Sequence, residues 1–342
     1  MNNKSFFAAA NGYEGFRSRF DKVFSHQRLN KLFVIKGGPG TGKSTLMKMI
    51  ANLFITNHNI TYVYCSSDPN SLDGIIIENN GIKIGIADGT SPHVIEPSYP
   101  GAFEEIINLG DGFDYHKLYN LSKQVIELND TKKYFYKKGY HALNVAGTIH
   151  KYILDYLCDH GTYNKTETVA KVLIKDLNIT ETTMVDHGFL IGAFCKEGYV
   201  KLNNPTHKKT IVIHGDGISE YILMSKLKDI LLQNKGILHI YPSAFSDDLY
   251  DSIETDKYVF TTNNQLSETF DSCELITSSV EYDRLKNMYI NLLNEAQKAF
   301  NFASDYHFKL EDIYSKSISF EENLGKYEKI TEEINYLLIN NR

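Results

Sequence analysis

The chain lacks the features that would mark a membrane, secreted or nucleic-acid-binding protein. Its longest apolar runs fall far short of the ~18 residues that a membrane-spanning helix needs. The net charge of −6 offers no overall basic character to attract nucleic acid or anionic lipid. The N-terminus carries one lysine and a short apolar patch, which is too weak a pattern for a secretory signal. We therefore expect a cytoplasmic protein with no membrane partner and no nucleic-acid partner.

Cysteine is also scarce. The four cysteines are widely spaced and none forms a C-x-x-C pair, which favours reduced thiols over a disulfide framework or a zinc site; they are Cys65, Cys158, Cys195 and Cys273. What remains is an ordinary globular composition, with 342 residues and 42% hydrophobic content. That length favours two domains.

One glycine-rich segment stands out from this background. Gly37-Gly38-Pro39-Gly40-Thr41-Gly42-Lys43-Ser44 fits the pattern G-x-x-x-x-G-K-[ST] at every fixed position. Residues 32–35 before it have the character of a short buried strand, and residues 44–51 after it have the character of a helix. Strand, glycine-rich turn and helix form the setting of a phosphate loop.

The residue types of this loop suit a nucleotide. Glycines allow successive backbone N–H groups to face phosphate oxygens, and the N-terminus of the following helix adds its positive dipole end. Lys43 would neutralise the β- and γ-phosphates, Ser44 would ligate Mg²⁺, and Thr45 would donate to the α-phosphate. We predict ATP and Mg²⁺ as cofactors, with these nucleotide-binding residues: Gly37, Gly38, Pro39, Gly40, Thr41, Gly42, Lys43, Ser44 and Thr45.

Two aspartates join Lys43 in the predicted catalytic set. Asp88 ends the β-type run 82–87, where a phosphate-loop enzyme holds Mg²⁺, so Ser44 and Asp88 are the predicted metal ligands. Opening a turn before Gly89 is the alternative role for Asp88. Asp68 follows a predicted strand at residues 60–64 and could orient water or act as a base, although Asp-Pro-Asn is equally typical of a turn.

Three further features have weaker functional interpretations. Asp73 shares the ambiguity of Asp68, and His93 is interpreted as a loop residue with an alternative role near the γ-phosphate. Residues 132–138 mix lysines with aromatic residues, which can bind single-stranded nucleic acid. A solvated helix face is favoured there, because the whole chain is acidic.

The second half of the sequence repeats the first in the same order. The strand and glycine at residues 33–37 have a counterpart at 211–215, and Ala142-Leu143-Asn144-Val145-Ala146 recurs as Ala299-Phe300-Asn301-Phe302-Ala303. Each half alternates strands with helices, which indicates a mainly parallel sheet flanked by helices. We predict tandem phosphate-loop NTPase-like domains of the α/β class at residues 1–180 and 186–342, joined near residues 178–183.

Each half should also end in a long helical hairpin. In the first half, apolar residues recur at helical spacing from Leu118 to Tyr156, and a shorter helix near 165–177 would follow Gly161. The matching segments of the second half are 281–314 and 321–338. Hairpin packing explains these seams better than any ligand role.

The whole arrangement resembles an uncharacterised family of bacterial, mainly Firmicutes, ATP-binding proteins with tandem phosphate-loop domains. The resemblance rests on the loop itself and on the segments Cys65-Ser66-Ser67-Asp68, Ser71-Leu72-Asp73-Gly74 and Asp88-Gly89-Thr90-Ser91-Pro92-His93. It implies ATP rather than GTP, and ATPase activity without a named substrate. The second loop departs from the family pattern, because Gly215-Asp216-Gly217-Ile218-Ser219-Glu220-Tyr221 lacks the lysine and adds two acids. We therefore expect the second half to bind no nucleotide.

These observations lead to one expectation and two alternatives. We expect a Mg²⁺-dependent ATP-binding protein that hydrolyses ATP slowly at the first loop. A kinase acting on a small molecule or nucleotide, with Asp68 as base, is the first alternative, although no arginine lies between Arg28 and Arg284 to form a phosphate-covering lid. A non-enzymatic protein whose partner contacts are switched by ATP is the second, so the expected partners are the nucleotide and an unidentified small molecule or protein.

Overall fold

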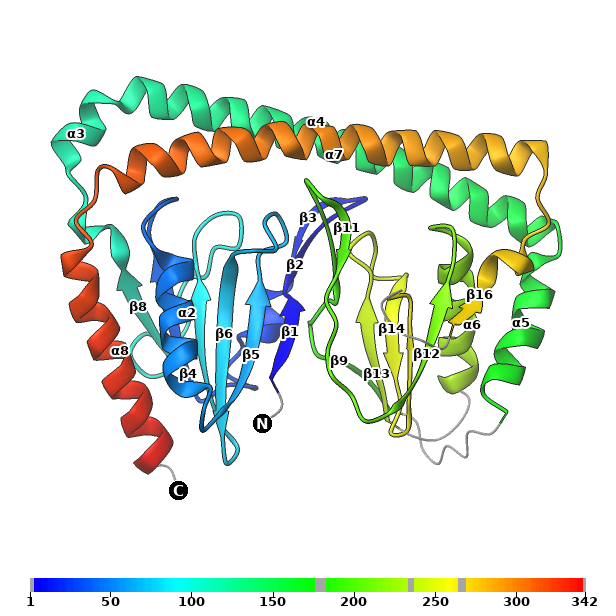
Figure 1. Cartoon of the computed structure of the whole chain (residues 1–342), viewed down its shortest axis with the longest axis horizontal. Helices are drawn as coiled ribbons and strands as arrows, with labels where there is room; N and C mark the ends of the chain where they lie inside the picture. Colours follow the sequence, from blue (N-terminus) through cyan, green and yellow to red (C-terminus); the bar gives the residue numbers. More distant parts are fainter. Residues whose placement is uncertain (1–2, 176–182, 233–236, 264–268, 341–342) are drawn as a thin grey trace. The chain divides into compact units, whose positions relative to one another are not determined.

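The fold consists of two mixed, mainly parallel six-stranded sheets with flanking helices (Figure 1). The computed structural model describes residues 3–175, 183–232, 237–263 and 269–340. The predicted join at residues 178–183 therefore lies almost entirely outside the described residues. By contacts, the chain divides into two compact units: unit 1 comprises Met1–Ala9, Ser18–Lys138 and Ala299–Arg342, and unit 2 comprises Ala10–Arg17 and Gly139–Lys298.

The sheet of unit 1 contains one strand that opposes all the others. β6 is antiparallel to both of its neighbours, β5 and β7, whereas β1, β4 and β8 pair in parallel. The predicted strands near 60–64 and 82–87 are confirmed as β5 and β7, and β6 was not predicted. In sheet order the strands are β1 (Lys4–Phe7), β5 (Asn59–Tyr64), β6 (Leu72–Asn79), β7 (Ile82–Asp88), β4 (Lys31–Lys36) and β8 (Glu104–Asn108).

The sheet of unit 2 repeats this topology strand for strand. Its single reversed strand, β14, again lies between the second and fourth strands of the order. The shared order and direction support the predicted duplication. In the corresponding order the strands are β9 (Thr183–Asp186), β13 (Ile237–Pro242), β14 (Tyr250–Glu254), β15 (Tyr258–Thr261), β12 (Lys209–His214) and β16 (Thr269–Asp271).

Several short elements complete the two units. Each sequence half also contains a two-stranded sheet, which precedes β4 in the first half and β12 in the second. The strands are β2 (Ala9–Gly12) and β3 (Gly15–Ser18), and β10 (Gly192–Cys195) and β11 (Gly198–Lys201). The short helices are α1 (Phe20–Val23), η1 (Leu109–Gly112), α3 (Tyr115–Asn120) and η2 (Ser272–Leu275).

The predicted long helices are confirmed as α4 (Ser122–Asp159) and α7 (Val280–Ser315), and they pack together. In unit 1, Phe135 of α4 stacks on Phe302 and Tyr306 of α7 at ring-centroid distances of 5.1 and 5.8 Å. In unit 2, an apolar cluster joins α4 to the other end of α7; it includes Ala146, Ile153, Leu157, Tyr282, Leu285 and Tyr289.

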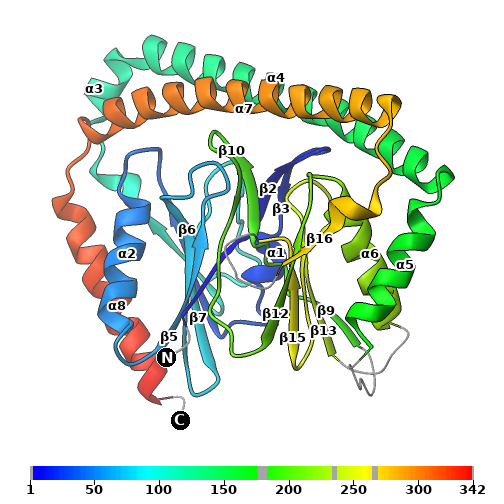
Figure 2. The same cartoon turned by 45° about the vertical axis from the view of Figure 1, so that its right-hand side comes forward.

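The helices that follow this pair belong to the unit of the opposite sequence half. α8 (Glu321–Asn340) lies beside α2 (Lys43–Phe54) in unit 1 (Figures 1 and 2). Its buried Ile330 and Ile334 belong to the same hydrophobic core as residues of α2. In unit 2, α5 (Thr162–Leu173) packs against α6 (Ser219–Leu232). The division between the units falls inside both long helices, because α4 passes from unit 1 to unit 2 after Lys138 and α7 passes from unit 2 to unit 1 after Lys298.

The compact units therefore cut across the predicted boundaries of 1–180 and 186–342. Those boundaries assign α5 and α8 to their own sequence halves, and all but the last residue of β9 lies between them. Periodicity identifies a helix and its buried face, and it carries no information about which sheet that face covers.

Among the described residues, no helix is both long enough and apolar enough to cross a membrane.

Candidate functional site

The glycine-rich loop lies in unit 1 between the end of β4 and the start of α2. Gly42 has a φ of +88° and immediately precedes the first turn of α2, and Gly40 has a φ of +71°. Both angles lie in the left-handed region, where a residue with a Cβ is strained. The glycines are therefore needed to turn the chain so that the N-terminus of a twelve-residue helix faces the loop.

Lys43 begins α2 and folds back over the loop. Its Nζ donates to the carbonyl oxygens of Gly37 and Gly38 at 3.0 and 2.8 Å, and it lies 3.6 Å from Asp88 Oδ2. Two carbonyl oxygens and one carboxylate oxygen therefore hold the ammonium group at the loop. The oxygens of a bound anion could take their place. The next residue, Ser44, accepts a hydrogen bond from Leu72 N at 2.9 Å through its Oγ, which keeps one further lone pair for a ligand.

Asp88 reaches Lys43 because its strand pairs directly with β4. β7 runs parallel to β4, and Asp88 is in register with Ile35, two residues before Gly37. Its Oδ1 accepts hydrogen bonds from Thr90 N at 2.9 Å and Thr90 Oγ1 at 2.6 Å. These bonds fit the predicted turn role, and the Oδ2 that faces Lys43 fits the predicted metal role. Asp88 is buried although it is the last residue of its strand.

The remaining predicted residues lie around this centre. Thr41 is buried and its hydroxyl donates to Gly38 O at 2.9 Å, whereas Thr45 is exposed on the first turn of α2. Asp68 opens a turn after β5, because Ser71 N donates to Asp68 O at 2.9 Å. Asp68 does not belong to the cluster that Asp88 forms with its neighbours.

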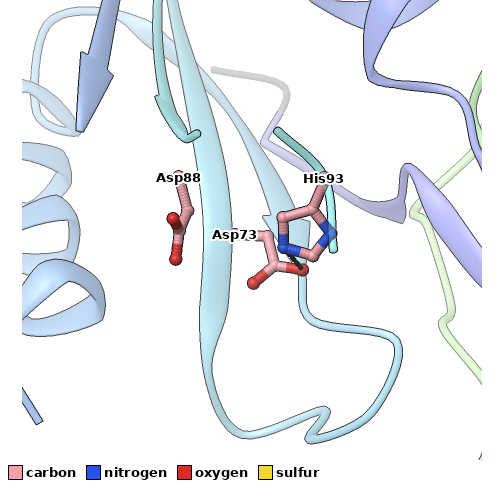
Figure 3. Close-up of side chains that lie close together, drawn as sticks. All are labelled: Asp73, Asp88 and His93. Atoms are coloured by element: carbon pink, nitrogen blue, oxygen red, sulfur yellow. Dashed lines mark ion pairs between the residues drawn. The ribbon is translucent and has the colours of Figure 1, made fainter. Parts of the chain in front are cut away.

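That cluster contains two residues that sequence reasoning had given only minor roles. Ligand atoms of Asp73, Asp88 and His93 all lie within 4.8 Å of one another, and all three residues are buried (Figure 3). His93 Nε2 is 3.4 Å from Asp73 Oδ2, and the His93 ring stacks on Phe20. Burial raises the pKa of Asp73 to about 6; His93 opposes this rise and Asp88 adds to it.

Asp73 lies on strand β6, which the sequence analysis did not predict. The run Ile75-Ile76-Ile77 is followed by Asn80-Gly81, a two-residue turn with φ angles of +48° and +85° that leads directly into β7. Asn-Gly is the strongest short-range signal for such a hairpin. Taking that signal into account would have placed Asp73 on a strand, at the same sheet edge as Asp88.

Residues near the C-terminal end of the sequence contact the loop within unit 1. A Cβ on Gly38 would lie 3.6 Å from the Tyr314 ring, and one on Gly42 would lie 3.4 Å from the Phe320 ring. Asn323 Nδ2 donates to Thr41 O at 3.3 Å. The loop is therefore packed by the end of α7, by the start of α8 and by the connection between them.

The corresponding loop of unit 2 is occupied by its own acids. Glu220 is buried, and its carboxylate accepts from Gly217 N at 3.0 and 3.2 Å. Asp216 accepts from Ser219 N at 3.0 Å, and its Oδ2 is 2.7 Å from Lys286 Nζ and 2.6 Å from the Tyr282 hydroxyl. A carboxylate thus already uses a backbone N–H of this loop.

Two other sequence features have structural roles. Arg284, in unit 2, forms a two-pronged pair with Glu281 at 2.7 and 2.9 Å and is largely exposed. In the 132–138 segment, Phe135 and Tyr136 contact aromatic rings of α7, so this part of the segment packs against a helix.

Comparison with known proteins gives one partial match. Residues 16–75 match the family described as Nephrocystin 3, N-terminal, a region found in NTPase-containing proteins. The matched segment runs from β3 to the start of β6 and includes the whole loop. No curated protein and no solved structure matches the chain.

Proposed function

We propose that the chain is a Mg²⁺-dependent ATP-binding protein that hydrolyses ATP at the loop of residues 37–45. The observation that carries the proposal is the convergence of Lys43 and Asp88, whose charged atoms are 3.6 Å apart beside the N-terminus of α2. An ammonium group, a carboxylate and free helical N–H groups are the elements that a nucleoside triphosphate and its metal ion require. The match of the same segment to a family found in NTPase-containing proteins is consistent with this proposal.

Each residue has a defined role in this proposal. The loop N–H groups and Lys43 would bind the phosphates, so that charge developing during transfer meets groups already in position. Ser44 and Asp88 supply oxygen ligands, which are the kind that Mg²⁺ prefers. Bound Mg²⁺ would neutralise phosphate charge. Asp68 is the candidate group for orienting the attacking water.

A phosphotransferase remains the first alternative, with Asp68 as base for a substrate hydroxyl. The second alternative, a nucleotide-controlled switch, is favoured by a specific observation. Tyr314, Phe320 and Asn323 contact the loop from the far end of the sequence, so a nucleotide that changes the loop would act directly on α7 and α8. A ligand can shift such contacts only by binding one arrangement more tightly than the other.

Steady-state phosphate release separates these possibilities. The purified protein is incubated with ATP and Mg²⁺, and phosphate and ADP are both measured with and without candidate hydroxyl substrates. Equal, steady production of both without an added substrate supports the ATPase. ADP production that depends on an added substrate supports the phosphotransferase, and ATP binding without turnover supports the switch. Failure to bind ATP would overturn the proposal.

A further inference from the structure

Asp73 is a buried carboxylate with an unsatisfied oxygen. The residue is only 5% exposed, and Asp73 Oδ2 has no hydrogen-bond partner among the described residues. This oxygen points into the cluster with His93 and Asp88 (Figure 3). A buried polar atom without a partner is costly, so a native structure that keeps one calls for an explanation.

A β-bulge in β6 sets the direction of the Asp73 side chain. In the ladder between β5 and β6, Val63 pairs with Gly74 and Tyr64 pairs with Leu72, so Asp73 is the extra residue of a β-bulge. Bulges redirect a side chain and occur preferentially next to functional sites. Because β6 starts where β7 ends, the bulge brings Asp73 to Asp88 at one edge of the sheet.

In the second copy, the corresponding carboxylate is hydrogen-bonded by protein side chains. In unit 2, Tyr241 pairs with Ser252 and Pro242 pairs with Tyr250, so Asp251 is the extra residue of the same bulge. The copy that has lost the loop lysine satisfies this carboxylate with protein groups. Asp251 accepts hydrogen bonds from the Tyr199, Tyr221 and Thr262 hydroxyls at 2.6, 3.2 and 3.3 Å, and Lys201 Nζ lies 4.0 Å away.

In unit 1 the side chains that lower the pKa of Asp73 are His93, Cys65 and Lys43, and none of them is a hydroxyl group. The place of Thr262, the residue after β15, is taken by Asp88 at the end of β7, so a hydroxyl donor is replaced by a second carboxylate. His93 approaches the pair with a ring nitrogen. Around this carboxylate the first copy thus has a second carboxylate and an imidazole, which can each give an electron pair to a cation, where the second copy has hydroxyl donors.

We propose that Asp73, Asp88 and His93 form a binding site for a divalent cation of the Mn²⁺ class, occupied without nucleotide. Two carboxylates and one imidazole suit Mn²⁺ and similar transition-metal ions better than Mg²⁺, which prefers oxygen ligands alone. The site lies beside the proposed nucleotide Mg²⁺ position and shares Asp88 with it. It goes beyond the proposed function because it requires no nucleotide.

The test is Mn²⁺ binding to the nucleotide-free protein, measured by the loss of the free-Mn²⁺ electron paramagnetic resonance signal. We expect one Mn²⁺ per chain in the wild type, bound at least ~10-fold more tightly than Mg²⁺ in competition. Asp73→Asn keeps the size of the side chain, and His93→Phe keeps the ring on Phe20. Loss of supporting groups around a metal typically costs ~10–100-fold in affinity, so loss of a ligand in either variant should cost at least that.

Matched controls are Asp21→Asn and His58→Phe, which make the same chemical changes elsewhere in unit 1 and should bind Mn²⁺ as the wild type does. Absence of Mn²⁺ binding by the wild type, or wild-type affinity in both Asp73→Asn and His93→Phe, would overturn the site. ATP binding is measured on the same samples. A protein that binds ATP and Mg²⁺ but no Mn²⁺ without nucleotide refutes this site alone, and one that binds Mn²⁺ but no ATP refutes the proposed function alone.

Discussion

The carbonyl oxygen of Glu311 lies 2.5 Å from the point that a Cβ on Gly40 would occupy. Gly40 belongs to the loop, and Glu311 belongs to the last turns of α7. A contact this close leaves no room for a side chain, so the loop and the C-terminal helices are fitted to each other within unit 1. The site of the first sequence half is thus built partly from residues of the second half.

Replacing Gly40 with alanine should destabilise the protein by ~2–4 kcal/mol. The new Cβ would meet the Glu311 backbone and would also be held at a φ of +71°. Gly81→Ala is the matched control, because its φ is +85° but nothing lies within 4 Å of the added Cβ. Urea unfolding should show a loss of only ~1 kcal/mol for this control. Equal losses in the two variants would mean that backbone strain alone matters.

Lys43→Ala should weaken binding of a non-hydrolysable ATP analogue by ~10–100-fold and abolish turnover. The ammonium group is the charged side chain held inside the loop, and charge-assisted hydrogen bonds contribute ~1.5–3 kcal/mol. Lys48→Ala is the control on the same helix, since Lys48 donates to Asn70 O at an exposed position. Wild-type affinity in Lys43→Ala, measured by calorimetry, would remove Lys43 from the site.

Asp88→Asn should lose the gain in nucleotide affinity that Mg²⁺ gives to the wild type. The amide keeps a hydrogen-bond acceptor for Thr90 but removes the charge that faces Lys43. Binding of the ATP analogue is compared with Mg²⁺ and with a chelator present. A variant that still responds to Mg²⁺ as the wild type does would move the metal role elsewhere, and Asp68→Asn would be the next variant to measure.

His150, buried in unit 2, should contribute a loss of folding stability as the pH decreases from ~6.5 to ~4, whereas Asp73, whose pKa is raised to about 6, contributes in the opposite direction. Burial lowers the pKa of His150 to about 4, so the unfolded chain takes up a proton over this range that the folded chain refuses. The stabilisation is complete above pH ~6.5, and up to ~3 kcal/mol of it is lost towards pH 4. In urea unfolding, the stability difference between the wild type and His150→Phe should change by up to this amount over the range, whereas the difference for His141→Phe, at an exposed position of α4, should stay constant.

Local patterns predicted much of the fold. The spacing of apolar residues identified α4, α7 and α8, and the loop motif fixed the boundary between β4 and α2. The antiparallel strand β6 was missed because the parallel α/β pattern was extended past the Asn80-Gly81 turn. The exchange of α5 and α8 between units depends on packing between residues far apart in sequence, which no local pattern records.

The candidate site was predicted only in part for the same reason. Lys43 and Ser44 follow from a contiguous motif, whereas Asp73 and His93 reach Asp88 through a β-bulge and a loop. Their isolated positions in sequence resemble ordinary turn residues. The register of β6 against β5 and β7 places Asp73 beside Asp88, and the loop after β7 brings His93 into the same buried cluster.

The most direct test of the account is the stoichiometry of nucleotide binding. Isothermal titration of the full chain with a non-hydrolysable ATP analogue and Mg²⁺ should give one site per chain, because Glu220 already occupies the second loop. The Lys43→Ala titration should show that site lost. Two sites in the wild type, or none, would contradict a single nucleotide site at the loop of residues 37–45.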